Sequence, residues 1–274
     1  MGERFLAHFA AGDWAAIAEM LADDYWSDDR RRVVGAGIRH GRDGAIANMR
    51  AIADLGLTNA AATVVATRGG RLALMSARIS GRNQGSEVFL FDVLAVAEIS
   101  AGERIAAVVV FDPDDIDAAV AELDSRYRAG EAAAHANTWS VIAGAHAGVN
   151  QHEFPPTTPN SVYIDHRPVV RVDAVDLAAS LRALWDLAPD LSVYIEALHR
   201  LSEFGAVVTQ ALKGTSQEGF YAEWRAIDIF TVEGDSISRC EVFDEADLDA
   251  ALARFDELNR PPPLRSSSSP DVLL

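Results

Sequence analysis

Two short segments place an arginine two residues after an aspartate, a spacing that could hold a ligand or an activated base. The pairs are Asp29 with Arg31 and Asp165 with Arg167. On an extended strand, residues two apart project from the same face. The arginine keeps the carboxylate ionised and oriented, which suits a general base or a group that anchors a ligand. The alternative is a structural ion pair at the entrance of a strand.

Two further carboxyl groups stand within apolar runs. Asp92 lies in VFLFDVLAV, and Glu223 takes the matching place in FYAEWRAI. A carboxyl that faces an apolar cavity has a raised pKa, because its charged form is penalised, and it can act as an acid or base near neutral pH. Arg225 would share a face with Glu223, so these groups could instead lie on the solvated side.

A histidine and four aromatic residues accompany these acids. His199 ends the expected strand SVYIEALHR, where it could enter a pocket and shuttle a proton, or serve as a hydrogen-bonded histidine of the core or rim. The aromatic side chains could line a cavity for a flat or apolar ligand, or belong to the core. They are Trp26, Tyr194, Tyr221 and Trp224.

The segments that carry these residues recur along the chain. Residues 111–124 (FDPDDIDAAVAELD) and 243–256 (FDEADLDAALARFD) stand 132 residues apart and are identical at 8 of 14 positions. The same offset pairs Arg68 with Arg200, and the two Asp–Arg pairs are offset by 136. We interpret this as duplication of a unit of ~130 residues, the alternative being similar amphipathic helices that arose independently. The predicted domains are residues 1–127 and 128–260, and the Pro/Ser-rich residues 261–274 are expected to be disordered.

Each copy combines helical patterns with runs of β-branched residues. Helical spacing follows Asp13 and Asp43 in the first copy and covers residues 173–187 in the second. The expected long strands are residues 60–67, 71–80, 87–99 and 104–111, then 191–199, 206–212, 221–232 and 236–243. Short helices followed by an antiparallel meander predict an α+β fold, with helices packed on one face of a strongly curved antiparallel sheet.

This order of elements, with Gly-Asp-Trp at residues 12–14 and Asp-Asp-Arg-Arg at residues 28–31, resembles the NTF2-like superfamily and its SnoaL-like branch. Two tandem copies cover nearly the whole chain, which is similar to tandem modules of large actinobacterial proteins that also carry cyclase or ATPase domains. The resemblance implies two cone-shaped, cystatin-like domains, each around an apolar pocket. Members include ketosteroid isomerase, limonene-epoxide hydrolase, polyketide cyclases and non-catalytic modules, so the fold leaves the function open. The opening helix of the first copy, roughly residues 3–10, is shorter than the superfamily's usual one.

Three functions follow as alternatives. The leading one is a tandem pseudo-dimer within one chain that binds a small apolar or polyketide-like molecule, as a regulatory or sensory module and as a separate chain or part of a larger multidomain protein. The second is an acid–base enzyme, an epoxide hydrolase, cyclase or isomerase, that uses the Asp, Glu and His residues above. The third is a structural interaction module whose cavities are filled by side chains.

The amino-acid composition argues against several classes of binding partner and cofactor. The 274 residues include 24 Lys and Arg against 41 Asp and Glu, a formal net charge of −17, so phosphate backbones and anionic membranes would repel the chain. No nucleotide-binding, zinc-protease or serine-hydrolase motif occurs and the histidines are scattered, so no cofactor and no metal are expected. A single cysteine, Cys240, and the absence of a signal peptide or long apolar run predict a reduced cytoplasmic protein.

Overall fold

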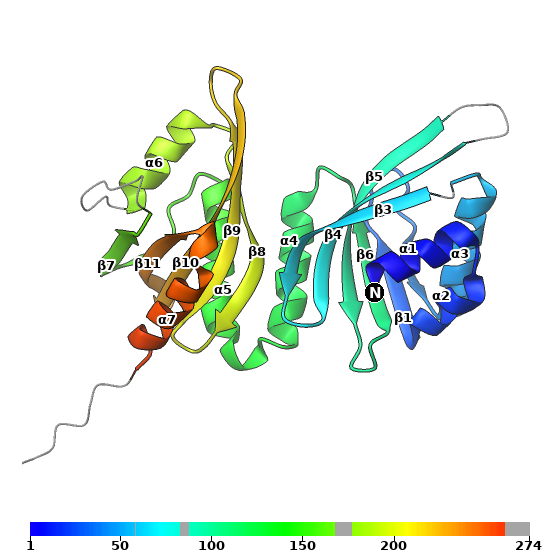
Figure 1. The fold of residues 1–274 in the computed structure, drawn as a ribbon, viewed down its shortest axis with the longest axis horizontal. Helices are drawn as coiled ribbons and strands as arrows, with labels where there is room; N and C mark the ends of the chain where they lie inside the picture. The colour runs from blue at the N-terminus through cyan, green and yellow to red at the C-terminus, as the bar shows by residue number, and fades with distance from the viewer. Residues whose placement is uncertain (58, 83–87, 168–176, 261–274) are drawn as a thin grey trace, which may run out of the picture.

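Figure 1 shows the computed structural model of the chain, which describes residues 1–57, 59–82, 88–167 and 177–260. Two α+β halves lie side by side, and each is built on one curved sheet with helices packed against it. The fold class predicted from the sequence is therefore confirmed. The predicted tail, residues 261–274, lies outside the described residues. No helix in the described part of the chain combines the length and apolarity needed to cross a membrane.

The first half begins with two short helices, and Asp13 caps the second of them by accepting a hydrogen bond from the backbone N–H of Ala16. Its elements are α1 (Gly2–Ala11), α2 (Trp14–Met20), β1 (Leu21–Asp29), β2 (Gly37–His40), α3 (Arg42–Asp54), β3 (Asn59–Arg68), β4 (Leu72–Arg82), β5 (Val88–Ile99), β6 (Ile105–Phe111) and α4 (Ile116–Ala129). Sheet 1 has the order β2-β1-β6-β5-β4-β3, with β1 parallel to β6 and every other pair antiparallel.

The second half repeats this plan with one long opening helix. Its elements are η1 (Ala133–His135), α5 (Ala136–Asn150), β7 (Thr157–Asp165), α6 (Leu177–Leu187), β8 (Ser192–Leu201), β9 (Gly205–Thr215), β10 (Tyr221–Glu233), β11 (Ser236–Asp244), η2 (Glu245–Asp247) and α7 (Leu248–Leu258). Sheet 2 has the order β7-β11-β10-β9-β8, and β7 is parallel to β11. The β1 and β7 strands thus hold the same place next to the last strand of their sheets.

Each sheet carries a C-terminal helix on one face, which we call the outer face. In the first half α4 packs there, in a cluster that includes Leu74, Leu94, Val96, Phe111, Ala119 and Leu123. In the second half α7 packs there, in a cluster that includes Val207, Ile227, Ile229, Phe243, Ala251 and Phe255. The opposite, inner face carries α1, α2 and α3 in the first half and α5 and α6 in the second.

The two halves share one hydrophobic core. Helix α4 lies between the outer face of sheet 1 and α5, and α5 in turn packs on the inner face of sheet 2 (Figure 1). Tyr127 of α4 and Trp139 of α5 meet edge to face at 5.6 Å between ring centroids. The core cluster draws on both sheets and both helices, including Leu74, Val96, Leu123, Trp139, Ile142, Val208 and Phe230.

Candidate functional site

Both predicted Asp–Arg pairs form, with the same three hydrogen bonds. The backbone N–H and Nε–H of Arg31 donate to Asp29 Oδ1 at 3.2 and 2.9 Å, and its Nη2 donates to Oδ2 at 2.7 Å. Arg167 makes the same bonds to Asp165 at 3.0, 3.0 and 2.7 Å. The Arg31 bonds lower the pKa of Asp29. Burial acts to raise the pKa of Asp165, but the Arg167 bonds outweigh it and the pKa is lowered. Both carboxyls are therefore ionised at neutral pH.

In the second half, the strand register places a second acid, Asp228, in the same cross-strand row as Asp165. Asp165 lies opposite Val242, Val242 opposite Asp228, and Asp228 opposite Val208. Residues directly opposite one another point to the same face of a sheet. Val208 and Val242 belong to the core that packs against α5, so Asp165 and Asp228 project from the inner face of sheet 2. Two carboxyls thus lie two strands apart on one apolar face.

Asp228 is fully buried, with 0% of the residue exposed, and neither carboxyl oxygen has a hydrogen-bond partner among the described residues. Burial raises its pKa to about 8; the positive charge of Arg167 opposes this rise and the negative charge of Asp165 adds to it. The group is therefore protonated at neutral pH, and it presents an O–H donor and a carbonyl acceptor that both lack a hydrogen-bond partner among the described residues. A buried polar group without a partner costs ~1–3 kcal/mol.

Two more groups on this face also remain neutral. Tyr163 lies opposite Cys240, and burial, together with nearby acids, raises the pKa of its hydroxyl, so it keeps its proton. His146 of α5 is half-buried, and the loss of solvation lowers its pKa. Its Nδ1 lies 2.9 Å from the Ile142 carbonyl and its Nε2 3.2 Å from the Gln210 side chain. The Gln210 atom that faces Nε2 is Oε1, and a neutral imidazole carries one N–H, so it can donate to only one of these two oxygen atoms.

We call Asp228, Asp165, Arg167 and Tyr163 together the Asp228 site. It holds an ionised carboxylate with its arginine and two protonated donors on the apolar inner face of one sheet. Such a site can bind an oxygen atom of an apolar molecule, or give and take protons.

The first half lacks the second acid. In sheet 1 the equivalent row runs from Asp29 through Val110 and Ala95 to Met75. Ala95 therefore stands where the second half has Asp228. The first half keeps the ion pair but has no protonated carboxyl on this row.

Asp92 does not face an apolar cavity. It alternates with Leu94 and Val96, which pack against α4, so it lies on the outer face of sheet 1 beyond the helix. There Arg78 donates to it from Nε at 2.7 Å and Nη2 at 3.0 Å. These bonds lower the pKa of the solvent-exposed carboxyl, so the raised pKa expected for a carboxyl that faces an apolar cavity does not apply to Asp92. Asp92 thus lies on the solvated side, the alternative stated for it, where it forms an ion pair with Arg78.

Glu223 also lies on an outer face. It is exposed and accepts hydrogen bonds from Arg225 Nη2 at 2.8 Å and from the Tyr221 hydroxyl at 3.3 Å. The sequence aligned Glu223 with Asp92, but the register does not. Leu94 lies opposite Phe111 and Ile227 opposite Phe243, so the counterpart of Asp92 is Arg225.

His199 is hydrogen bonded rather than placed in a pocket. Its Nε2 lies 2.7 Å from the Thr209 hydroxyl. Thr209 alternates with Val207, which packs beneath α7, so both side chains are on the outer face of sheet 2. Burial lowers the pKa of His199, which is therefore neutral at pH 7. It does not share a face with Asp228.

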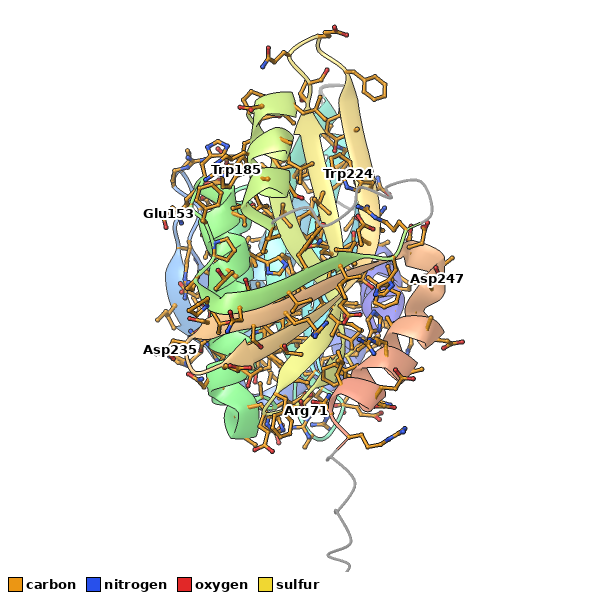
Figure 2. The ribbon with its side chains drawn as sticks, turned by 90° about the vertical axis from the view of Figure 1, so that its left-hand side faces the viewer. Arg71, Glu153, Trp185, Trp224, Asp235 and Asp247 are labelled. Atoms are coloured by element: carbon orange, nitrogen blue, oxygen red, sulfur yellow. The ribbon has the colours of Figure 1, made fainter. Side chains whose placement is uncertain are left out.

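The four aromatic candidates are spread over the molecule. Trp26 lies on the outer side of sheet 1, with the Arg126 guanidinium 4.7 Å above its ring. Tyr221 is exposed on sheet 2. Tyr194 is buried beside Lys213, whose Nζ lies 5.3 Å from the ring, and it lines a pocket between α4, α5 and β8, as a cavity-lining residue was expected to do. Only Trp224 packs on the inner face, in the cluster beneath α6 at the upper end of β10 (Figure 2). These residues therefore do not line one common cavity.

Asp228 is the residue that the sequence reasoning missed. It stands as a lone acid in the apolar strand RAIDIFTV. The same signal had singled out Asp92, so it was available for Asp228 too. Tyr163 and His146 carry no comparable signal, because single aromatic residues in amphipathic elements are common.

One acidic group among the described residues has the geometry to hold a cation: Asp112, Asp114 and Asp115 after β6. Arg32 already bonds to two of them, with Nε 2.9 Å from Asp112 and Nη2 2.6 Å from Asp114. The arginine supplies the positive charge that a metal would bring, so the group is an ion-pair cluster.

Comparison with known proteins yields neither a matching family model nor a matching curated protein. The solved structures that resemble part of the chain include those of the following three proteins. An NTF2-like protein of unknown function from Exiguobacterium sp. 255-15 is 17% identical, with a TM-score of 0.34, over 41% of this chain and 97% of its own. The epoxide hydrolase/cyclase-like enzyme SalBIII, which acts in pyran ring formation in polyether salinomycin, is 16% identical, with a TM-score of 0.34, over 40% of this chain and 84% of its own. A putative polyketide cyclase from Xanthomonas campestris is 17% identical, with a TM-score of 0.33, over 43% and 90%. None of these likenesses carries a function over to this chain.

Proposed function

We propose that the second half binds a small, largely apolar molecule at the Asp228 site, and that Asp228 donates a hydrogen bond to an oxygen atom of that molecule. The observation that carries this proposal is the carboxyl itself: it is buried, and neither of its oxygen atoms has a hydrogen-bond partner among the described residues. Its raised pKa keeps it protonated at neutral pH. A carbonyl, ether or epoxide oxygen would satisfy the donor, and binding would recover the cost of leaving it unpaired.

The rest of the site supports an apolar ligand. Asp228 is flanked across the sheet by Val208 and Val242, and the neighbouring row contains Phe230 and Cys240. The Asp165–Arg167 pair is internally neutralised, so it adds polarity without a net charge. An apolar molecule with one acceptor oxygen matches this combination better than an ion does.

A second candidate function is acid–base catalysis, because two carboxyls on one face have pKa values displaced in opposite directions. Opening of an epoxide illustrates the step. Asp228 gives its proton to the epoxide oxygen as the carbon–oxygen bond breaks, and water attacks the carbon while Asp165 accepts its proton. Transfer of that proton from Asp165 to Asp228 through solvent restores the starting state.

We also infer that the two halves descend from one duplicated unit, with the boundary near residues 127 and 128. The support is geometric. Asp29 lies opposite Val110 and Asp165 opposite Val242, and these two valines are separated by the 132-residue offset seen in the sequence.

Native mass spectrometry of the purified chain tests the binding proposal. We expect a bound species that is lost in Asp228→Ala and kept in the control Asp92→Ala, whose carboxyl lies on the outer face. A species retained by Asp228→Ala would place binding elsewhere and overturn the proposal.

Turnover needs a separate assay, with cyclohexene oxide as a small apolar epoxide. Catalysis predicts diol formation that falls by ~10²-fold or more in Asp228→Asn, since a positioned acid contributes about that much. Binding without diol formation would leave the ligand-binding function and eliminate the enzymatic one.

A further inference from the structure

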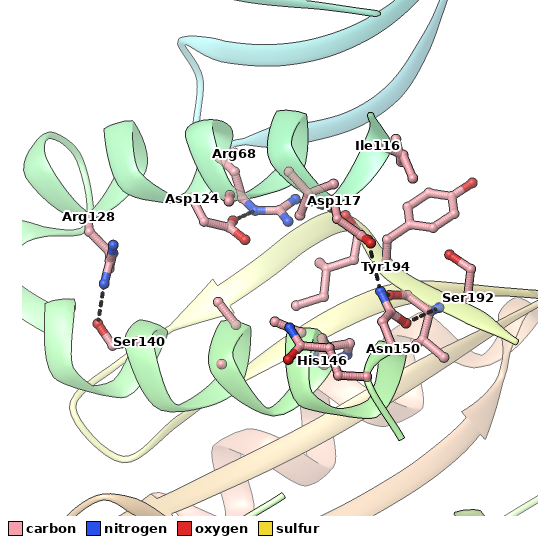
Figure 3. A pocket seen from close by; sticks show the side chains of 18 residues that line it. Arg68, Ile116, Asp117, Asp124, Arg128, Ser140, His146, Asn150, Ser192 and Tyr194 are labelled. Carbon is pink, nitrogen blue, oxygen red and sulfur yellow. Dashed lines mark hydrogen bonds and ion pairs between the residues drawn. The ribbon is translucent and has the colours of Figure 1, made fainter. Parts of the chain in front are cut away.

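A pocket of about 330 Å³ lies between the two halves, away from the Asp228 site. Figure 3 shows α4 and α5 facing each other across it, with strand β8 behind them. Arg68 and Asp124 line it on the side of the first half, and His146 and Asn150 on the side of α5. Its volume is at the lower end of the ~300–1,000 Å³ typical of small-molecule pockets.

Small residues at the facing positions of the two helices leave this space open. They are Ala121 of α4 and Ala143, Gly144 and Ala147 of α5. A Cβ atom added at Gly144 would meet no atom within 4 Å. The pocket therefore exists because two helices approach each other without side chains that fill the space between them.

One end of the pocket holds a buried ion pair that is incompletely hydrogen bonded. The Arg68 side chain is 0% exposed. Its Nε donates to Asp124 Oδ1 at 2.7 Å, and its Nη1 donates to the carbonyls of Thr67 and Ile195 at 2.9 Å. Among the described residues, neither its buried Nη2 nor Asp124 Oδ2 makes a hydrogen bond, although the guanidinium lies 5.0 Å from the centroid of the Trp139 ring.

Comparison with the Asp29–Arg31 pair shows which hydrogen bond the Arg68–Asp124 pair lacks. There the second guanidinium nitrogen, Nη2, bonds to the second carboxylate oxygen at 2.7 Å. In the Arg68–Asp124 pair the corresponding donor and acceptor stay apart. Together they can bind one group that accepts a hydrogen bond and donates another.

The charges that line the pocket cancel. Arg68 and Arg128 face Asp117 and Asp124, and most of the remaining surface is apolar. Arg128 is further bonded to Ser140, and Asp117 to Asn150. A charged ligand would leave one charge uncompensated in a partly enclosed space, so an uncharged molecule fits best.

We infer that this pocket binds a small uncharged molecule with an apolar body and one primary carboxamide or hydroxyl group. That group accepts a hydrogen bond from Arg68 Nη2 and donates one to Asp124 Oδ2. Because α4 belongs to the first half and α5 and β8 to the second, the bound molecule contacts both halves. The inference is independent of the function proposed for the Asp228 site.

Titration with cyclohexanecarboxamide, followed by methyl NMR, tests the inference. The methyl groups of Ile116, Val120, Val193 and Ile195 line the pocket and report directly on its occupancy. We expect saturable shifts of these signals. Cyclohexanecarboxylate has nearly the same shape but carries a negative charge next to Asp124, and we expect it to bind at least ~10-fold more weakly.

The decisive variant is one whose new side chain fills the pocket. Gly144→Leu places a side chain in the open space without a backbone clash and should abolish the shifts caused by the carboxamide. Gly44→Leu on α3 is the matched control, because Gly44 is also a helical glycine with open space around it and lies outside the pocket. It should bind the carboxamide as the wild type does.

Three outcomes would overturn the inference. The first is the absence of shifts at these methyl groups with both cyclohexanecarboxamide and cyclohexanol, which would mean that water alone fills the pocket. The second is binding that persists in Gly144→Leu. The third is equal binding of the carboxamide and the carboxylate, which would exclude recognition by the Arg68–Asp124 pair.

Discussion

The two halves of the chain share the order of five strands, an Asp–Arg pair with the same bonds and a C-terminal helix on the outer face, yet residues on their inner faces differ. Ala95 of the first half is replaced by the buried, protonated Asp228 in the second. We assign the shared features a structural role, because both halves have them. Asp228 adds a buried, protonated carboxyl that the first half lacks, and for this reason we place the proposed ligand-binding function in the second half.

The outer faces differ as well. Helix α7 covers sheet 2 on its own, whereas α4 is enclosed between sheet 1 and α5. Arg68 and Arg200 show the effect on single residues. Arg68 is buried against Asp124, while Arg200 is exposed. The same residue type therefore has a different energetic role in each half.

The largest expected effect concerns this contrast. Arg68→Met should lower the free energy of unfolding by ~3–5 kcal/mol, because it leaves Asp124 as a buried, unpaired charge. Arg200→Met should stay within ~0.5 kcal/mol of the wild type, as exposed substitutions usually do. Urea denaturation of both variants measures the difference. Equal effects would mean that the buried pair contributes no more than a surface charge.

The second largest effect is expected from exchanging Asp228 and Ala95, the equivalent residues on the two inner faces. Asp228 takes up a proton on folding, since its folded pKa of about 8 lies above the value of ~3.9 for an unfolded aspartate. Its contribution to stability therefore declines as the pH rises from about 4 to 8. Asp228→Ala should remove this decline, so that the variant gains on the wild type by ~1 kcal/mol per pH unit.

Ala95→Asp is the reciprocal change. It should impose the same pH dependence on the first half and destabilise the protein most at pH 8. Thermal unfolding between pH 5 and pH 8 measures both variants. A wild-type and an Asp228→Ala curve that run parallel would show that Asp228 is ionised in the folded protein.

A smaller and equal effect is expected at the two Asp–Arg pairs. Asp29→Asn and Asp165→Asn should each lower stability at pH 7 by roughly 1 kcal/mol, allowing for the partial exposure of the pairs. Both pKa values are lowered in the folded protein, so this contribution is complete above about pH 4 and is lost as the pH falls through the lowered values. Unfolding at pH 7 and pH 3 tests this, and clearly unequal effects would contradict the equivalence of the pairs.

The smallest effect is expected on the outer faces. Asp92→Asn and Glu223→Gln alter exposed ion pairs and should leave the melting temperature unchanged. Neither should alter a ligand bound at the Asp228 site. Loss of that ligand in either variant would show that the mutated acid contributes to ligand binding.

Much of the fold could be predicted because the chain contains its pattern twice. The strand expected at residues 104–111 corresponds to β6 at Ile105–Phe111, and the segment expected at 236–243 to β11 at Ser236–Asp244. The Asp–Arg pairs were predicted correctly for a local reason: two residues on one strand determine their own geometry. Such pairs need no knowledge of the rest of the fold.

The face of a lone acid could not be predicted in the same way. Both sheets carry helices on both faces, so their central strands are apolar throughout and the usual alternation is lost. Asp92 and Asp228 therefore look alike in sequence, although one is exposed and the other buried. Irregular pairing in β3 and β8 adds to the difficulty: Arg200 lies opposite Val207, level with Ala66 of the first half rather than with Arg68.

The position of α4 also limits how this protein could be divided. Leu123 and Tyr127 of this helix are covered by groups from both sides of the molecule. Cutting the chain near residue 130 would separate α4 from α5 and expose apolar surface of both fragments to solvent. We therefore expect the two halves to fold together as one unit and not as separate fragments.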